Sequence, residues 1–166
     1  MADLGFRILG GVHRRVYRLT GGKLGGRLGN MPVLLLTTIG RKSGRPRTQP
    51  LTYTQSGDGY AVIASKGGAP QHPLWYLNLR ANPLAEVTVG REMRKVRARD
   101  AQGEERERLW RELADVYPGY DRYAQRTSRR IPVVVLELIG ADRDRTRGTA
   151  AGLGSRPASL SGGGGI

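Results

Sequence analysis

The sequence predicts a mainly β fold, namely an antiparallel barrel with flanking helices on its outside. The first observation is the order of the expected elements, which is three strands, a helix, two strands, a helical region and a final strand. The second is that the strands arrive as hairpin pairs, whereas a doubly wound parallel sheet would place a helix between successive strands. The third is the length of 166 residues, which suits one domain with a single core.

Residues 1–30 are expected to form a basic, amphipathic N-terminal segment. In residues 4–20, apolar residues recur four apart, as on one face of a helix, with arginines between them: Leu4, Ile8, Val12 and Val16. Residues 21–30 contain too many glycines for a regular element and are interpreted as a mobile connector. The helix is compatible with contact with an anionic membrane surface, and equally with a cover over the core or the active-site mouth.

The next three strands are predicted to form two hairpins. The turns GRKSGRP and SGDG separate three runs that are rich in β-branched and apolar residues: 33–39, 47–55 and 60–65. A helix is then expected to have Pro73 at its first position, where the missing N–H costs no hydrogen bond, and to run to about Ala81. Asn82-Pro83 ends it, because a residue that precedes proline disfavours helical backbone angles.

The second half of the chain is predicted to complete the barrel. Two strands flank the Gly90-Arg91 turn, and a last apolar run forms the final strand: 85–89, 93–100 and 131–139. Residues 102–115 form a helix with acidic residues in its first turn, and a short helical segment spans 119–127. Residues 141–166 are small, polar and glycine-rich, so we expect a disordered tail after a folded domain of residues 31–140.

Positive charge is concentrated in the first half of the chain. The formal net charge is +14, and between Asp3 and Asp58 there are ten Lys or Arg residues and no acidic residue. This surface implies an anionic partner, which is a nucleic acid, an anionic membrane, or a phosphorylated or polycarboxylate small molecule.

The composition also argues against disulfides, a metal centre, a membrane span and secretion. The chain has no cysteine and only two histidines, so we predict neither a disulfide framework nor a metal centre. No apolar run approaches the roughly 18 residues that a membrane span needs, and the N-terminus lacks the apolar core and cleavage site of a secretory signal. We therefore expect a cytoplasmic protein.

The turn GRKSGRPR, residues 40–47, is predicted to hold an anion. Its glycines and Ser43 allow backbone N–H groups to converge, and four cations surround them: Arg41, Lys42, Arg45 and Arg47. It is not a Walker A loop, because the G-x-x-x-x-G-K-[ST] spacing and the following helix are absent. The alternative is a solvated basic loop without a specific ligand.

Two further groups of residues have the chemistry of a ligand site. The glycines of Ser65-Lys66-Gly67-Gly68 let a flat ligand approach the backbone, with Trp75, Tyr76 and Asn78 beside it. Ordinary core packing is the alternative for this aromatic pair. Tyr117, Tyr120 and Tyr123 are three apart, as on one helix face, and their hydroxyls can donate hydrogen bonds or protons to a substrate oxygen. A packed amphipathic segment is the alternative here.

Taken together and in this order, the three groups resemble the deazaflavin-dependent nitroreductase family over about residues 31–139. The motifs are GRKSG-x-PR-x-x-PL, ASKGG-x-x-x-x-P-x-WY-x-NL-x-ANP and YP-x-Y-x-x-Y. The resemblance implies a split β-barrel related to the FMN-binding, pyridoxamine oxidase-like fold. It also implies an enzyme that uses coenzyme F420 to transfer a hydride to a small-molecule acceptor, namely a quinone, a nitroaromatic or an activated enone.

The resemblance further implies roles for individual residues. The anionic tail of F420, with its phosphodiester and glutamate carboxylates, would lie on five residues of the basic turn: Arg41, Lys42, Ser43, Gly44 and Arg47. The ring would be bordered by residues of three segments: Pro50, Leu51, Ala64, Ser65, Lys66, Gly67, Gly68, Trp75, Tyr76 and Asn78. The catalytic residues would be those that orient the acceptor and a candidate donor opposite them: Tyr117, Tyr120, Tyr123 and Ser65. Solvent is the alternative proton source.

Two other function classes stay open at this point. One is a split barrel that binds a flavin or haem without turnover, and the other is a basic nucleic-acid-binding protein, although no RNP motif, zinc finger or helix-turn-helix supports specific nucleic-acid recognition. The N-terminal segment leaves open a peripheral contact with the inner face of an anionic membrane, where hydrophobic quinones reside. The physiological acceptor and the oligomeric state are not indicated by the sequence.

Overall fold

The computed structural model describes residues 27–28 and 31–140. These residues form seven strands: β1 (Arg27–Leu28), β2 (Met31–Ile39), β3 (Pro46–Ser56), β4 (Gly59–Ile63), β5 (Leu84–Val89), β6 (Glu92–Asp100) and β7 (Val133–Leu138). They also form a short 3-10 helix and three α-helices: η1 (Lys66–Gly68), α2 (Leu74–Ala81), α3 (Gly103–Val116) and α4 (Gly119–Gln125). The predicted helix at 4–20 and the predicted tail at 141–166 lie outside the described residues.

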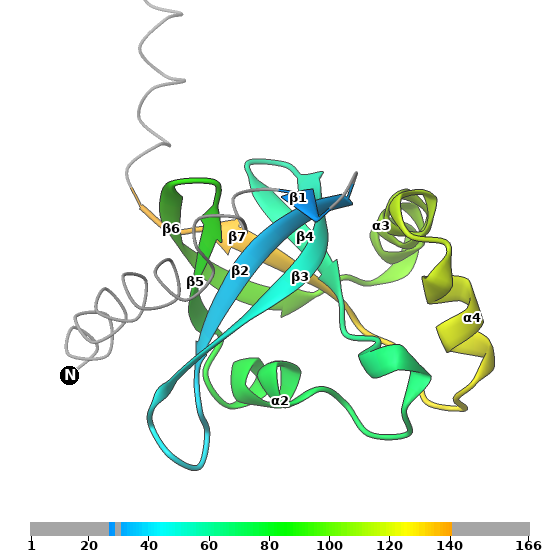
Figure 1. Cartoon of the computed structure of the whole chain (residues 1–166), viewed down its shortest axis with the longest axis horizontal. Helices are drawn as coiled ribbons and strands as arrows, with labels where there is room; N and C mark the ends of the chain where they lie inside the picture. Colours follow the sequence, from blue (N-terminus) through cyan, green and yellow to red (C-terminus); the bar gives the residue numbers. More distant parts are fainter. Residues whose placement is uncertain (1–26, 29–30, 141–166) are drawn as a thin grey trace, which may run out of the picture.

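Strands β2 to β7 close into a six-stranded antiparallel barrel (Figure 1). They follow one another as β2-β3-β4-β7-β6-β5, and β5 pairs back to β2 from Leu35↔Thr88 to Thr37↔Glu86. The predicted barrel is therefore confirmed. Strand β1 extends the sheet by two residues that pair with Met31 and Pro32, so the prediction of an irregular connector is wrong at Arg27–Leu28.

Apolar side chains form one cluster inside the barrel and a second beneath α3 and α4. On β7, Val134 and Leu136 belong to the inner cluster, whereas Val133 and Val135 belong to the outer one together with Leu109 of α3. The first four residues of β7, from Val133 to Leu136, are buried on both faces of the strand, which explains their continuous apolar run. The outer cluster fixes the two helices against the barrel wall.

Helix α2 closes the lower end of the barrel as drawn in Figure 1. Trp75, Tyr76 and Leu79 pack into the inner cluster with the strand residues. Pro73 precedes the helix instead of forming its first residue, since its backbone is extended (ψ 149°) and its carbonyl accepts hydrogen bonds from the N–H groups of Tyr76 and Leu77. The prediction of the helix start was thus wrong by one position, and its end at Ala81 is confirmed.

Candidate active site

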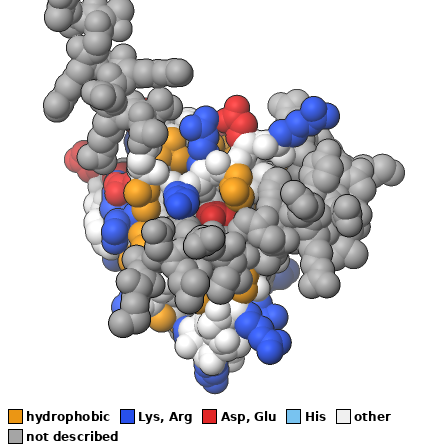
Figure 2. All heavy atoms as spheres, turned by 90° about the vertical axis from the view of Figure 1, so that its left-hand side faces the viewer, with side chains coloured by type: hydrophobic (Ala, Val, Ile, Leu, Met, Phe, Trp, Pro, Cys, Tyr) orange, Lys and Arg blue, Asp and Glu red, His pale blue; other side chains and the backbone are white. Residues whose placement is uncertain are grey.

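The basic turn between β2 and β3 projects from the lower end of the molecule, where Figure 2 shows Lys and Arg side chains. Two backbone hydrogen bonds close the turn, from the N–H of Gly40 to the carbonyl of Arg45 and from that of Gly44 to the carbonyl of Gly40, both at 2.8 Å. The predicted cations are all exposed: Arg41, Lys42, Arg45 and Arg47. The side chains are thus available to a ligand while the backbone is held.

Asn78 of α2 supports this turn by a hydrogen bond to its backbone. Its amide is buried, with the oxygen accepting a hydrogen bond from the Arg41 N–H and the nitrogen donating to the Thr38 hydroxyl, both at 3.1 Å. Both ends of the amide therefore bind the chain itself. The prediction that Asn78 contacts the coenzyme stays a prediction, and the role that the structure shows is that of a support for the turn.

The predicted nest of backbone donors is only partly present. Besides the two bonds that close the turn, the N–H of Arg41 is taken by Asn78 and that of Arg45 by the Ser43 hydroxyl at 3.3 Å. Among the turn residues, the N–H groups of Lys42 and Ser43 have no partner within the described residues. Anion binding by this turn would therefore depend mainly on its cationic side chains.

Residues 64–69 form a second surface, in which the backbone itself is the prominent feature. Lys66, Gly67 and Gly68 all have positive φ angles of 47°, 64° and 80°, which is a left-handed turn that glycine tolerates at no steric cost. A Cβ on Gly67 would meet nothing within 4 Å, so the space in front of it is open. Within the described residues, the N–H groups of Ser65, Lys66 and Gly67 have no acceptor.

Arg129 holds this segment from behind and is the main residue that sequence reasoning missed. Its guanidinium donates to the carbonyls of Ser65 at 2.7 Å, Ala69 at 2.8 Å and Ala64 at 3.3 Å. Arg129 thus fixes the backbone of the segment, whose N–H groups at Ser65, Lys66 and Gly67 are left for solvent or a ligand. No sequence motif marks Arg129, which lies 60 to 65 positions from the groups it binds.

His72 joins the same network. Its Nδ1 lies 3.2 Å from a guanidinium nitrogen of Arg129, and its ring packs on that of Tyr76 with centroids 4.9 Å apart. Burial, followed by the positive charge of Arg129, lowers the pKa of His72. A neutral ring can accept a hydrogen bond from Arg129, so His72 helps to position the arginine that binds residues 64–69.

The predicted aromatic pair, Trp75 and Tyr76, is part of the barrel core. Trp75 and Tyr76 are 5% and 4% exposed, and their rings meet edge to face at 6.2 Å. The Tyr76 hydroxyl donates to Asp100 at 2.8 Å, and burial raises the pKa of Tyr76. The packing alternative accounts for both residues in this structure, and their contact with the coenzyme stays a prediction. Pro50 is exposed, whereas Leu51 packs against the barrel core.

The three tyrosines of the third motif come together, although not as one helix face. Tyr117 directly follows α3, which ends at Val116, and α4 begins at Gly119, so the prediction of a single face was wrong. The ring of Tyr117 is 5.2 Å from that of Tyr120 and 6.0 Å from that of Tyr123. The cluster forms where the chain passes from α3 to α4 through Pro118.

The tyrosines divide into one packing residue and one hydroxyl pair. Tyr120 is 7% exposed and hydrogen-bonds Thr52, and burial raises its pKa. Tyr117 and Tyr123 are half-buried, with their hydroxyl oxygens 2.9 Å apart, and this hydrogen bond raises the pKa of Tyr123. The raised pKa keeps the Tyr123 hydroxyl protonated at neutral pH, so it can act as a donor.

The structure links the three predicted regions at one end of the barrel. In Figure 1 the β2–β3 turn, α2, η1 and α4 follow one another along this end. Asn78 connects α2 to the turn, and Arg129 connects His72, just before α2, to residues 64–69. Gly68 contacts α4 so closely that a Cβ there would lie 2.7 Å from the Tyr123 carbonyl oxygen.

Comparison with known proteins identifies the family to which this arrangement belongs. Residues 11–138 match the sequence profile of the F420H(2)-dependent quinone reductases. The chain belongs to this family. The resemblance inferred from the three motifs is therefore confirmed, and with it the prediction of an oxidoreductase that depends on F420.

Individual members of the F420H(2)-dependent quinone reductases and solved structures agree with this assignment. An F420H(2)-dependent quinone reductase of Mycobacterium tuberculosis is 46% identical over 129 residues, which cover 75% of this chain and 87% of the relative. A solved F420-H2 dependent reductase is 44% identical with a TM-score of 0.59, over 64% of this chain and 94% of the other. A domain-swapped dimer is 40% identical with a TM-score of 0.62, over 76% and 96%.

The groups present fit the coenzyme of this family. F420 combines a flat ring with a polyanionic tail. The open backbone at Gly67 with its unpaired N–H groups suits a flat ring, and the exposed cations of the basic turn suit phosphate and carboxylate oxygens. The fit thus rests on two surfaces that differ in their chemistry.

Proposed function

We propose that the protein reduces a quinone-type acceptor with F420H2 through three consecutive subsites at the lower end of the barrel. These are the basic turn at 40–47, the segment at 64–69 and the Tyr117–Tyr123 hydroxyl pair. The observation that carries the proposal is the arrangement of residues 64–69. Arg129 binds the carbonyls of Ala64, Ser65 and Ala69. The N–H groups of Ser65, Lys66 and Gly67 have no acceptor among the described residues, and the space in front of Gly67 is open.

The basic turn would hold the tail of the coenzyme. Arg41, Lys42 and Arg47 can each form charge-assisted hydrogen bonds with phosphate or carboxylate oxygens, assisted by the Ser43 hydroxyl and the close backbone at Gly44. Their exposure keeps them hydrated until a ligand binds, and the support from Asn78 limits the conformational entropy lost on binding. Binding at this subsite should weaken as salt is added.

Residues 64–69 would position the ring of the coenzyme. When bound, reduced F420 supplies a hydride, which is the redox chemistry that the protein itself lacks. The N–H groups of Ser65, Lys66 and Gly67 can donate hydrogen bonds to polar atoms of the ring, and the glycine allows contact with the backbone. Ser65 also offers a half-buried hydroxyl as a candidate proton donor.

Tyr117 and Tyr123 would orient the acceptor. In the hydroxyl pair one phenol donates to the other, which leaves the proton of the second to bind an acceptor oxygen. Tyr120 supports them by packing between the helices and the barrel. We therefore expect Tyr117→Phe to raise the KM for a quinone with little effect on F420 binding, and Tyr120→Phe to spare F420 binding as well.

A peripheral membrane contact at the cytoplasmic face is a separate part of this proposal. No helix among the described residues is long and apolar enough to cross a bilayer. The basic amphipathic pattern of residues 4–20 supports contact with an anionic surface instead. Deletion of residues 1–28 should reduce both liposome binding and turnover of a hydrophobic quinone. Unchanged values for both would refute this contact.

The decisive experiment is a fluorescence titration of the protein with oxidised F420. FMN and a short random DNA duplex are titrated in parallel at two salt concentrations. Saturable binding of F420, with FMN and duplex much weaker, is the expected result, and turnover with quinones, nitroaromatics and enones then defines the acceptor. Salt-sensitive binding of the duplex without binding of F420 would contradict the proposal, because the basic turn would then serve another polyanion.

A further inference from the structure

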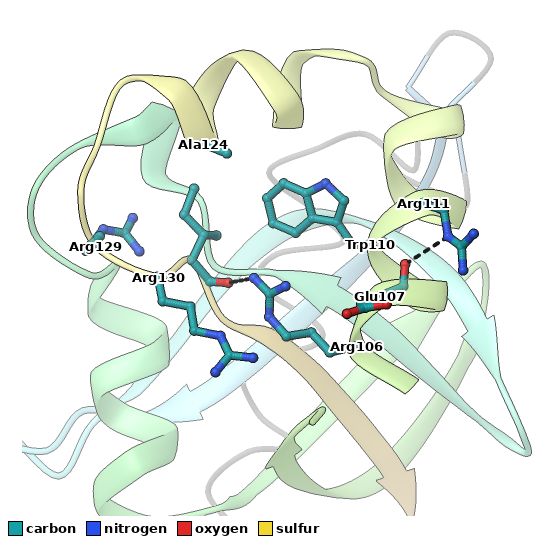
Figure 3. Close-up of a pocket in the computed structure, with 8 residues that line it drawn as sticks. Arg106, Glu107, Trp110, Arg111, Ala124, Arg129 and Arg130 are labelled. Atoms are coloured by element: carbon teal, nitrogen blue, oxygen red, sulfur yellow. Dashed lines mark hydrogen bonds between the residues drawn. The ribbon is translucent and has the colours of Figure 1, made fainter. Parts of the chain in front are cut away.

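A pocket between α3, α4 and the segment before β7 carries a group of arginines apart from the three subsites (Figure 3). Its volume of about 540 Å³ lies within the range of small-molecule sites. Four of its lining residues are cationic and one is acidic: Arg106, Arg111, Arg129, Arg130 and Glu107. We name it the α3–α4 pocket. Its charge favours an anionic occupant.

The pocket has a rigid apolar wall. The indole N–H of Trp110 donates to Asp121 at 2.8 Å, which fixes the orientation of the ring. Ile131 is buried in the cluster beneath the helices, and Ala124 of α4 also lines the pocket. These three side chains give a surface on which the apolar part of a ligand can pack without rearrangement.

A cationic wall adjoins the apolar one. Arg106 is held in place, since it donates to the Ile131 carbonyl at 2.9 Å and its guanidinium carbon lies 5.4 Å from the centre of the Trp110 ring. In Figure 3 the guanidinium groups of Arg106 and Arg130 lie on the same side of the pocket, below that ring. The two arginines therefore present a pair of planar donors to one space.

The two arginines are poorly compensated by negative charge. Burial, followed by the charge of Arg130, lowers the pKa of Arg106, and Glu107 offsets this only in part. Arg130 is exposed and makes no ion pair or hydrogen bond within the described residues, whereas the donors of Arg129 are bound to residues 64–69. An anion between Arg106 and Arg130 would relieve their mutual repulsion.

We propose that the α3–α4 pocket binds a small anion that carries an apolar ring and a carboxylate or phosphate group. The anionic group binds Arg106 and Arg130, whose planar guanidinium groups suit two oxygens of one ligand. The ring lies against Trp110 and Ile131. This site is separate from the coenzyme subsites, since none of its lining residues belongs to the turn at 40–47, the segment at 64–69 or the Tyr117–Tyr123 pair, and it does not depend on the proposed function.

The test uses the full-length protein labelled with nitrogen-15 and titrated with phenyl phosphate, benzoate and, as the neutral counterpart, benzyl alcohol. The chain has two tryptophans, so two indole N–H signals are expected, one from Trp110 in the pocket and one from Trp75 in the barrel. Saturable movement of the Trp110 signal alone, with both anions and much less with benzyl alcohol, is the expected result. Movement of neither signal, or of both to the same degree, would overturn the proposal.

Matched variants sharpen the test. Arg130→Gln should weaken the affinity for phenyl phosphate by about tenfold, because a charge-assisted hydrogen bond is lost. Arg122→Gln removes the same charge from an exposed position of α4 that does not line the pocket, and its affinity should stay within about twofold. An equal loss of affinity in both variants would contradict the proposal, because it would show that the overall positive charge of the protein attracts the anion. Displacement of phenyl phosphate by saturating F420 would show that the pocket belongs to the coenzyme site instead.

Discussion

The basic turn at 40–47 and residues 64–68 of the segment at 64–69 are both predicted to hold the coenzyme, yet the two regions are built in opposite ways. The turn exposes its cationic side chains and is supported chiefly by the buried amide of Asn78. The segment has its carbonyls bound by Arg129 and its Gly68 in contact with α4. One region thus presents side chains to a ligand, and the other presents backbone.

The difference shows why an arginine alone does not identify a binding site. The arginines of the turn make no side-chain hydrogen bond or ion pair within the described residues, so their charge is available to a ligand. Arg129 donates to three carbonyls and contacts His72, so its charge serves the fold of the segment. Substitutions in the segment should therefore affect stability and binding together, whereas those in the turn should affect binding alone.

The largest effect is expected for Gly68→Ala. A Cβ at this position would lie 2.7 Å from the Tyr123 carbonyl oxygen, and the φ of 80° is unfavourable for alanine. We expect the free energy of unfolding to fall by about 2–4 kcal/mol, as measured by urea denaturation. F420 binding should weaken in the same variant, because α4 must move away from residues 64–69.

Gly67→Ala is the matched control for this comparison. Its φ of 64° is also left-handed, but a Cβ there meets nothing within 4 Å, so only the backbone cost of about 1–2 kcal/mol applies. If the free energy of unfolding fell equally in the two alanine variants, the contact between Gly68 and α4 would not contribute to stability. Because Gly67 faces the proposed ring subsite, its alanine variant should nevertheless bind F420 more weakly.

Arg129→Gln is expected to have the next largest effect. Glutamine is too short to reach the carbonyls of Ala64, Ser65 and Ala69 together, so their hydrogen bonds are lost or replaced by water. The free energy of unfolding should fall by about 2–3 kcal/mol, and F420 affinity should fall with it. Arg130→Gln, at the next position, serves as the control for stability, since Arg130 donates to none of these carbonyls. A stable Arg129→Gln variant with normal F420 affinity would refute the positioning role.

In the turn, Lys42→Ala and Arg47→Ala should each weaken F420 binding by about 1.5–3 kcal/mol at most, without a change in unfolding temperature. Both side chains are exposed, so their removal leaves the packing unchanged. Arg91→Ala removes an exposed cation from the β5–β6 turn at the opposite end of the barrel and should leave the affinity unchanged. Equal losses in all three variants would mean that only the overall charge attracts the coenzyme.

The barrel could be predicted because its signals are local. Each hairpin is encoded by a turn between apolar runs, and the expected strand ends lie within about two residues of those observed. The features of the site that could not be predicted depend on contacts between residues far apart in the sequence. Arg129 is one arginine among many in the sequence, and only the fold brings it to residues 64–69. Likewise, the burial of Trp75 and Tyr76 follows from the way in which α2 closes the barrel.

The smallest effect concerns the dependence of stability on pH, through His72. Its pKa is lowered in the folded protein, first by burial and then by Arg129, with Arg80 acting in the same direction and Asp100 against it. The unfolded chain therefore binds the proton more readily, so the contribution of the neutral ring is complete above about pH 6.5 and is lost as the pH falls below it.

Between pH 7.5 and pH 5 the wild type should lose slightly more unfolding free energy than His72→Gln. The glutamine oxygen can accept from Arg129 without titrating, whereas protonated His72 would repel that guanidinium and loosen residues 64–69. Urea denaturation of both proteins at the two pH values measures the difference, and parallel losses would show that the histidine is not coupled to Arg129.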